Sequence, residues 1–470
     1  MTRSKFSPAK YRRIMVWMRR SLRVADNGTL ALALQDGGEV LPFVCASDGP
    51  EEDSPRGRFV RGAVADLERR LRMRGSALFF IRGDAPRQIP RTAYALQADA
   101  LFVQASADPE AIRDDAKLAR ALRQVGCAFV AVDDSVIMPK DLLLNKAGNP
   151  YTVFTPYRNA WLSNIGILPT PYATALRPLS GDVPPGTFSP FPPSGDEKGK
   201  GGESAALARL GEFCRAGMAA YDADRDFPAI DGTSRLSSHI AHGTISVRTV
   251  YSAAVRAGAR RFIDELIWRE FYHQVLGHFP YVAGAPFRKE FAGLSWSRKK
   301  SAFELWCAGM TGYPLVDAGM RQLNAEGWMH NRVRMVAASF LTKDLHIDWR
   351  KGESYFSRRL VDADVASNNG GWQWSAGTGT DAAPYFRVFN PVSQGKKFDP
   401  DGVYVRRYVP ELSNVPAPFI HAPWEMGAAL AKERSFRIGR DYPPPVVDHG
   451  AERAVALELY RYARTGRGRS

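Results

Sequence analysis

At 470 residues the chain is longer than a single hydrophobic core usually supports, so two or three domains are expected. Hydrophobic residues make up 45% of it and charged residues 24%, as in ordinary soluble globular proteins, and no apolar run approaches the roughly 18 residues of a membrane helix. The net charge of +15 favours a polyanionic partner, most commonly nucleic acid, although a basic proteome would give the same excess.

The first part of the chain, residues 12–135, alternates short apolar runs with longer helical patterns at 57–74 and 112–125. This alternation is typical of right-handed βαβ units and therefore of a parallel sheet. We predict an α/β domain with a Rossmann-like parallel sheet. Its predicted strands are Ile14–Trp17, Glu39–Val44, Ala77–Ile81, Ala100–Val103 and Ala128–Val132.

The composition changes after this domain. From Leu179 to Glu203, Pro, Gly, Ser and Lys dominate, which is typical of a linker. We assign residues 136–203 to a long linker. Amphipathic helical patterns then continue to the C-terminus, so residues 204–463 are predicted to form an all-α domain.

The cysteines and the glycine patterns exclude several kinds of site. No CxxC pair occurs and no His stands at ligand spacing from a cysteine, which predicts reduced thiols, no metal site and a cytoplasmic location. No GxGxxG follows the first strand, and GxxxxGK[ST] is absent, so those nucleotide sites are unsupported. The four cysteines are Cys45, Cys127, Cys214 and Cys307.

The stretch Asp362–Asp381 combines acids, adjacent amides, paired glycines and a Trp-x-Trp with few aliphatic residues. It lacks the apolar stripe of a core helix, so bulk burial does not explain its residue types. On helical geometry Trp372 and Trp374 point about 200° apart. One indole can therefore line a cavity while the other packs behind it.

Asn368–Trp374, followed by Gly379–Arg387 and Phe389–Pro391, resembles the flavin-site signature of the photolyase/cryptochrome family, in detail the class I cyclobutane pyrimidine dimer photolyases. Met18–Asn27 is similar to the family's opening motif, with Met18 in place of an aromatic residue. The resemblance implies an α/β domain joined to a helical domain that binds FAD. It covers nearly the whole chain and is densest over residues 221–410.

A hydroxyl-rich turn at 233–237 offers donors for a phosphate, although an ordinary helix N-cap has the same composition. By resemblance this turn binds the FAD pyrophosphate, Arg334 pairs with Asp362, and Asn368 faces the flavin N5 atom. The residues expected to bind FAD are Tyr221, Thr233, Ser234, Arg235, Leu236, Ser237, Arg269, Arg334, Asp362, Asp364 and Asn368.

Four residues of 265–272 stand at positions i, i+3, i+4 and i+7 and share one helix face: Glu265, Trp268, Arg269 and Tyr272. An amphipathic surface helix with a Glu–Arg ion pair is the plain alternative. The resemblance instead places this face against the dimer. The residues expected to contact DNA or the dimer are Glu265, Trp268, Tyr272, Asn331, Arg332, Met335, Trp374 and Gln394, with phosphate attraction from Lys396, Lys397, Arg406 and Arg407.

Three tryptophans, Trp296, Trp349 and Trp372, fill the positions of the family's electron relay to photo-excited flavin. A single buried Trp is more often core filler, so the weight comes from all three together. With Glu265 and Asn368 they form the expected catalytic set. Met335 stands where six-four photolyases usually have a second histidine, which favours cyclobutane dimers as the substrate.

The function implied is light-dependent DNA repair: a flipped-out cyclobutane pyrimidine dimer is split by an electron from photo-excited reduced FAD. A cryptochrome-type blue-light photoreceptor without repair activity is the alternative, and a DNA-binding flavoprotein without photochemistry is a second. Some family members hold an antenna, a folate or a deazaflavin; near the expected contact Ala111 stands in place of Glu, and we assign neither. We expect a monomer whose partner is DNA containing pyrimidine dimers.

Overall fold

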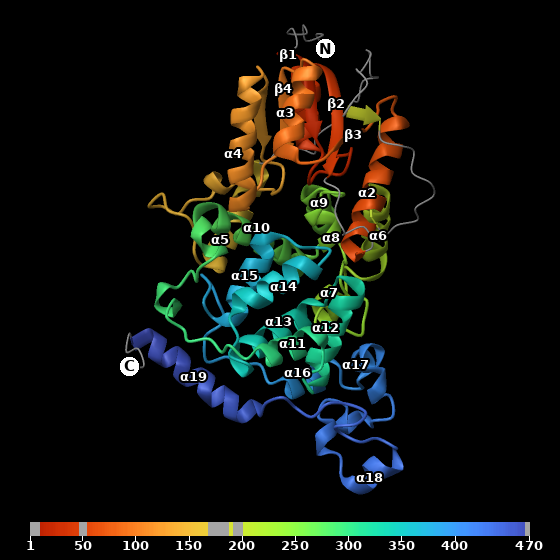
Figure 1. The fold of residues 1–470 in the computed structure, drawn as a ribbon, viewed down its shortest axis with the longest axis vertical. Coiled ribbons are helices and arrows are strands. Elements are labelled where there is room, and N and C mark those ends of the chain that lie inside the picture. The colour runs from red at the N-terminus through yellow and green to blue at the C-terminus, as the bar shows by residue number, and fades with distance from the viewer. Residues whose placement is uncertain (1–9, 47–53, 168–187, 191–200, 466–470) are drawn as a thin grey trace. The chain divides into compact units, whose positions relative to one another are not determined.

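The computed structural model describes residues 10–46, 54–167, 188–190 and 201–465 (Figure 1). The chain divides into two compact units. Unit 1 takes in residues 1–150, 158–216 and 234–278, and unit 2 takes in 151–157, 217–233 and 279–470. The domain boundaries expected from the sequence stay predictions, and each unit is described by itself.

Unit 1 contains a six-stranded sheet in the order β5-β4-β1-β2-β3-β6. The first five strands pair in parallel, which confirms the predicted sheet, and β6 joins the edge antiparallel to β3. β6 lies inside the segment expected to be only a linker. The strands are β1 (Tyr11–Trp17), β2 (Gly37–Ala46), β3 (Phe79–Arg82), β4 (Ala100–Gln104), β5 (Ala128–Val132) and β6 (Phe188–Pro190).

Alternate side chains of β1 enter two separate cores, because successive residues of a strand point to opposite faces of the sheet. Ile14 and Val16 pack with residues of α1 (Gly28–Asp36) and α2 (Pro55–Arg72). Met15 and Trp17 pack with residues of α3 (Ala85–Ala95) and α4 (Pro109–Gln124). The sheet is thus covered by helices on both faces, as parallel sheets require.

The later part of unit 1 is helical. The helix α10 (Arg260–His278) is its longest described helix, and its buried residues include Leu266, Ile267 and Phe271. These elements are η1 (Lys140–Leu142), η2 (Ile165–Ile167), α6 (Glu203–Ala216), α8 (Ser237–Ala241), α9 (Val247–Arg256) and α10 (Arg260–His278), while α5 (Phe154–Asn164) has residues in both units.

Unit 2 is built from helices around one large core that includes Trp306, Trp349 and Trp372. A π-helical turn, η5 (Phe340–Asp344), continues directly from α13 (Asn331–Ser339). The helices are α7 (Tyr221–Asp224), α11 (Lys300–Ala308), α12 (Pro314–Glu326), α13 (Asn331–Ser339), α14 (Trp349–Arg359), α15 (Val365–Ala376), α16 (Pro391–Phe398), α17 (Val403–Tyr408), α18 (Ala428–Glu433) and α19 (His449–Thr465). Short 3₁₀ turns are η3 (Pro280–Ala283), η4 (Lys289–Phe291), η6 (Pro410–Leu412), η7 (Ala417–Phe419) and η8 (Pro423–Glu425).

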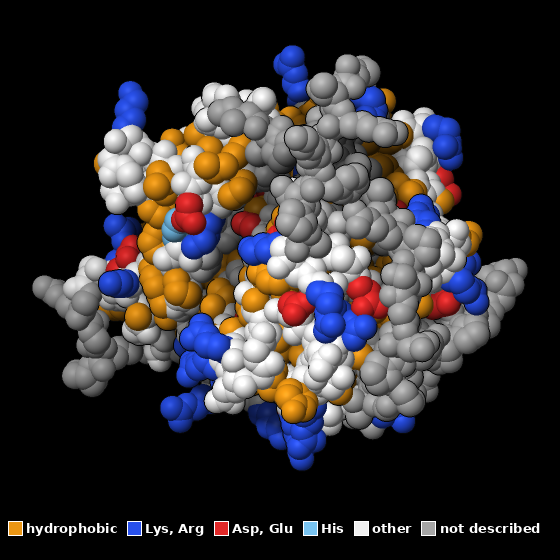
Figure 2. All heavy atoms as spheres, turned by 90° about the horizontal axis from the view of Figure 1, so that it is seen from above, with side chains coloured by type: hydrophobic (Ala, Val, Ile, Leu, Met, Phe, Trp, Pro, Cys, Tyr) orange, Lys and Arg blue, Asp and Glu red, His pale blue; other side chains and the backbone are white. Residues whose placement is uncertain are grey.

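Among the described residues no helix is both long and apolar enough to cross a membrane. Nor does the described part of the chain bring together three or more His, Cys, Asp or Glu side chains in a group that could hold a metal ion. Lys and Arg side chains are spread around the face shown in Figure 2 rather than gathered in one patch.

Candidate functional site

The residues predicted for the site come from both units. Those in unit 1 are Ser234, Arg235, Leu236, Ser237, Glu265, Trp268, Arg269 and Tyr272. Those in unit 2 are Tyr221, Thr233, Trp296, Asn331, Arg332, Arg334, Met335, Trp349, Asp362, Asp364, Asn368, Trp372, Trp374 and Gln394.

The predicted face of α10 exists. Glu265, Trp268, Arg269 and Tyr272 are all half-buried, whereas the residues between them turn into the core. The Trp268 and Tyr272 rings lie 5.5 Å apart, so this face presents two adjacent aromatic rings beside a carboxylate. Glu265 lies 3.9 Å from Arg261, while Arg269 donates to the Ser135 carbonyl at 2.8 Å.

Glu270 anchors the opposite side of α10. Its buried carboxylate accepts hydrogen bonds from the backbone N–H groups of Ile137 and Met138 and, at 2.7 Å, from the Trp161 indole. Burial raises the pKa of Glu270, while these donors favour its charged form. The residue pattern does not single out Glu270, since an acid directly after an arginine looks like an ordinary exposed residue.

The turn before α8 holds Arg235 in the left-handed region at φ +55°. A non-glycine residue in this region carries backbone strain of the kind often found at ligand-binding turns. Ser234 accepts from the Leu236 N–H with its hydroxyl and from Arg209 with its carbonyl. Ser237 is the first residue of α8 and stays exposed.

In unit 2, α13 carries two arginines in different roles. Arg332 pairs with Asp226 at 2.8 Å, and its guanidinium lies 4.4 Å from the centre of the Phe398 ring. On the exposed side of the same helix, Asn331 lies 3.8 Å from the Met335 sulfur. Asn331 is exposed at the start of α13, while Arg332 and Met335 are half-buried on the same helix.

The ion pair predicted between Arg334 and Asp362 is confirmed. Arg334 Nη2 lies 2.8 Å from Asp362 Oδ2, and Arg334 Nε donates to the Met329 carbonyl. The other carboxylate oxygen, Asp362 Oδ1, is buried and has no hydrogen-bond partner among the described residues. Buried polar atoms are normally paired, so this oxygen fits a hydrogen-bond donor that the protein itself does not provide.

The first turn of α15 places the acid and amide of the signature. Asp364 is the N-cap residue of the helix and accepts from the Ser367 N–H at 2.8 Å. The amide nitrogen of Asn368 donates to the Glu353 carbonyl at 3.0 Å. A carbonyl can only accept, so the Asn368 oxygen points away from that contact.

The two tryptophans of Trp-x-Trp have different surroundings. Trp372 is 2% exposed and lies 5.0 Å from the Phe356 ring and 6.1 Å from the Trp306 ring. Trp374 is half-buried and stacks on Phe389 at 6.4 Å. This difference agrees with the helical geometry, which points the two indoles about 200° apart.

The other two predicted relay tryptophans differ in exposure. Trp349, the first residue of α14, is buried, and Trp296 is half-buried. Gln394 is half-buried on α16, with its buried amide oxygen lacking a partner among the described residues. The neighbouring Lys396 and Lys397 are exposed.

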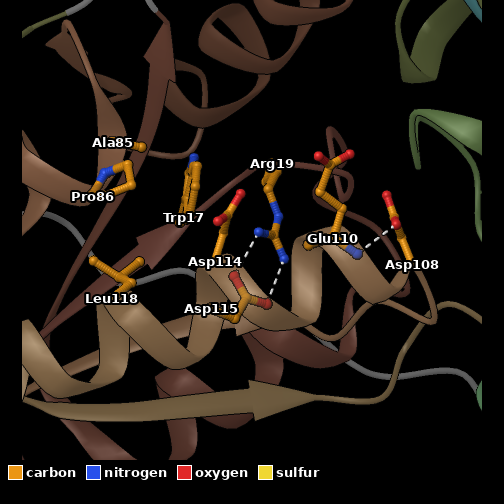
Figure 3. Close-up of a pocket in the computed structure, with 10 residues that line it drawn as sticks. Trp17, Arg19, Ala85, Pro86, Asp108, Glu110, Asp114, Asp115 and Leu118 are labelled. Carbon is orange, nitrogen blue, oxygen red and sulfur yellow. Dashed lines mark hydrogen bonds and ion pairs between the residues drawn. The ribbon is translucent and has the colours of Figure 1, made fainter. Parts of the chain in front are cut away.

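A separate cavity of about 290 Å³ lies in unit 1 (Figure 3). It opens where β1, β3 and β4 end, beside the point where the strand order reverses, which is the usual ligand position in open α/β sheets. Arg19 lies over Trp17 and donates to Asp115 through both terminal guanidinium nitrogens, at 2.7 and 3.0 Å. Besides Asp115, the acidic residues that line the cavity are Asp108, Glu110 and Asp114, so the lining is strongly acidic.

Known proteins match the chain along almost its whole length. Residues 14–175 match the family model for DNA photolyase, and residues 262–462 match that for the FAD binding domain of DNA photolyase. A deoxyribodipyrimidine photo-lyase of Alkalihalophilus pseudofirmus is 38% identical over 95% of this chain and 97% of its own.

Solved structures agree with these matches. A class III photolyase from Agrobacterium tumefaciens superposes with a TM-score of 0.85 at 37% identity, covering 98% of this chain and 99% of its own. A cryptochrome from Synechocystis has a TM-score of 0.84 at 30% identity, over 97% and 100%. The chain therefore belongs to the photolyase/cryptochrome family.

Proposed function

We propose that this protein is an FAD-dependent photolyase that repairs cyclobutane pyrimidine dimers in DNA under blue light. The observation that carries the proposal is the Arg334–Asp362 pair just before α15, because Asp362 Oδ1 is a buried acceptor with no donor among the described residues, six residues ahead of the signature amide Asn368. The name of the Alkalihalophilus relative supports the same activity.

The residues present fit FAD. Asp362 Oδ1 would accept from the ribityl chain or ring edge, and the donors of 233–237 with Tyr221 would hold the pyrophosphate. Asn368 presents its oxygen and can accept from an N–H at the flavin N5 position. Bound FAD would supply light absorption and one-electron chemistry, while the protein supplies orientation and electrostatics.

Two groups of residues suit the damaged DNA. The adjacent rings of Trp268 and Tyr272 on α10 and the half-buried indole of Trp374 on α15 provide aromatic faces on which flipped-out bases can stack. Exposed Lys396 and Lys397, within a chain of net charge +15, would attract the phosphates. The three relay tryptophans would carry an electron to the flavin when it needs to be reduced.

The acidic cavity at the end of β1 is our candidate for any second chromophore. It has the position expected for a ligand of an α/β sheet and an aromatic side wall in Trp17. Arg19 is the one cationic side chain among the described residues that line it and is paired with Asp115, so the cavity would disfavour a phosphate-bearing ligand. We also propose that the protein works as a monomer in the cytoplasm, where its four free cysteines stay reduced.

The proposal is tested with purified protein and an oligonucleotide that contains one thymine dimer. Blue light should restore the DNA, and darkness should not. Glu265→Ala and Trp268→Ala should impair the repair yield while flavin content is unchanged, with Glu304→Gln on α11 as a surface control. If neither α10 variant changes the yield, the assignment of the substrate face is wrong, and if no light-dependent repair occurs, the photoreceptor alternative is favoured.

A further inference from the structure

Two consecutive amides of α15 bind the same residue of α14. Asn368 Nδ2 donates to the main-chain carbonyl of Glu353 at 3.0 Å, and Asn369 Nδ2 donates to the Glu353 carboxylate, also at 3.0 Å. Glu353 therefore holds the signature pair through both its backbone and its side chain. The residue pattern does not indicate this contact, since Glu353 lies in a polar run with Arg350 and Lys351.

A chain of hydrogen bonds fixes the orientation of both amides. Asn369 also donates to the Val282 carbonyl at 3.0 Å, and its oxygen accepts from Gln373 at 3.1 Å. Gln373 in turn donates to Val282 and accepts from the Phe287 N–H at 2.9 Å. Flipping the Asn369 amide would set oxygen against oxygen at two contacts, so only one arrangement satisfies the network.

The carboxyl group of Glu353 sits in an environment that favours its neutral form. Burial raises the pKa of Glu353 to about 7, with Asp348 acting in the same direction. The Asn369 hydrogen bond and the positive charge of Arg350 oppose this shift. From α15 the facing groups are the two uncharged amides, and the contact that η3 makes with the network among the described residues is the uncharged Val282 carbonyl.

We propose that Glu353 is a positioning residue of the flavin site: its main-chain carbonyl and its carboxyl group hold Asn368 and Asn369, so that the Asn368 oxygen is presented to the flavin with the carboxyl group behind it. The proposal rests on the proposed function, because it takes Asn368 to face the flavin. A negative charge on Glu353 disfavours added negative charge on a nearby flavin, by Coulomb's law. A protonated Glu353 removes that penalty, so reduced flavin should be more stable relative to oxidised flavin at low pH than at high pH.

The test is a redox titration of the bound flavin, followed by absorption without DNA, between pH 5.5 and pH 8.5. At a fixed solution potential, the ratio of reduced to oxidised flavin in the wild-type protein should fall with pH through an extra step near neutrality. Glu353→Gln keeps an acceptor for Asn369 but cannot ionise, so it should lack this step. The difference should reach about tenfold at high pH if one unit charge is felt across about 10 Å at an effective dielectric constant of about 20.

Two further variants sharpen the result. Glu304→Gln removes an exposed carboxylate that pairs with Lys300 on α11, and it should reproduce the wild-type profile. Asn369→Ala removes a hydrogen bond that lowers the pKa of Glu353, so the step should move to higher pH. A Glu353→Gln profile that follows the wild type at every pH, or a step that Asn369→Ala leaves in place, would overturn the proposal.

These outcomes are separate from a failure of the proposed function. Wild-type protein that contains no flavin would remove the basis for both. Flavin that binds and supports repair but shows the same pH profile in Glu353→Gln would refute only the role of Glu353. A structural role alone would change stability in both Glu353 and Asn369 variants and leave the extra pH step unmoved.

Discussion

Replacing Arg334 with methionine would leave Asp362 as a buried carboxylate without its cation. The two side chains meet at 2.8 Å, with 3% of Asp362 and 25% of Arg334 exposed. Removing one partner of a buried ion pair costs about 3–5 kcal/mol, because the remaining charge is uncompensated. Arg334 is partly exposed, so solvent already screens the pair, and we expect a loss of about 3 kcal/mol, at the low end of that range.

The assay is urea denaturation at pH 7.5 together with the flavin content of the purified protein. Arg332→Met is the matched control on the same helix, because its partner Asp226 is 33% exposed and loses less when left alone. Arg334→Met should lose more stability than Arg332→Met and should also lose flavin. A loss below about 1 kcal/mol with full flavin content would refute the reasoning that Asp362 is a buried, charged element of the cofactor site.

Three other changes give separate tests. Glu270→Ala leaves three buried hydrogen-bond donors without an acceptor, which costs about 1–3 kcal/mol for each donor. Thermal unfolding of this variant should therefore begin at a clearly lower temperature. An unchanged melting curve would contradict the anchoring role of Glu270. Gly352→Ala would place a Cβ 2.1 Å from the Trp372 ring, so we expect the free energy of unfolding, measured in urea, to fall by about 1–3 kcal/mol. Wild-type stability in this variant would mean that the ring is not packed this tightly. The folded-state pKa of Glu353, about 7, lies above its ordinary value of 4.5, so the folded state holds the extra proton and stability should fall as pH rises from about 4.5 to about 7. Glu353→Gln should remove up to about 3 kcal/mol of that fall, and equal pH slopes for the two proteins would contradict it.

Residue patterns predicted the parts of the fold that repeat locally. The strands β1 to β5 were found because continuous apolar runs mark strands buried on both faces. β6 was missed because it has only three residues within a Pro- and Gly-rich segment, too few to show an alternation of apolar and polar residues. It also ends in Pro190, and proline is tolerated in a strand only at a sheet edge.

The candidate site was only partly readable for a similar reason. The shared face of α10 follows from helical spacing, and the resemblance supplied the Arg334–Asp362 pair. Asp364 was expected only to bind FAD, and its role as the N-cap of α15 was not predicted. Glu353 and Glu270 were missed, since what distinguishes them is burial by partners at least 15 residues away in sequence, such as Asn368 for Glu353.

The most direct test of the central claim is an action measurement on one preparation. The purified protein is scanned for flavin absorption, mixed with DNA that carries a single dimer, and illuminated with blue light while restored DNA is counted. We predict bound flavin, and restoration that requires light and follows the absorption of the protein. Protein without flavin, or DNA restored equally in darkness, would contradict the account.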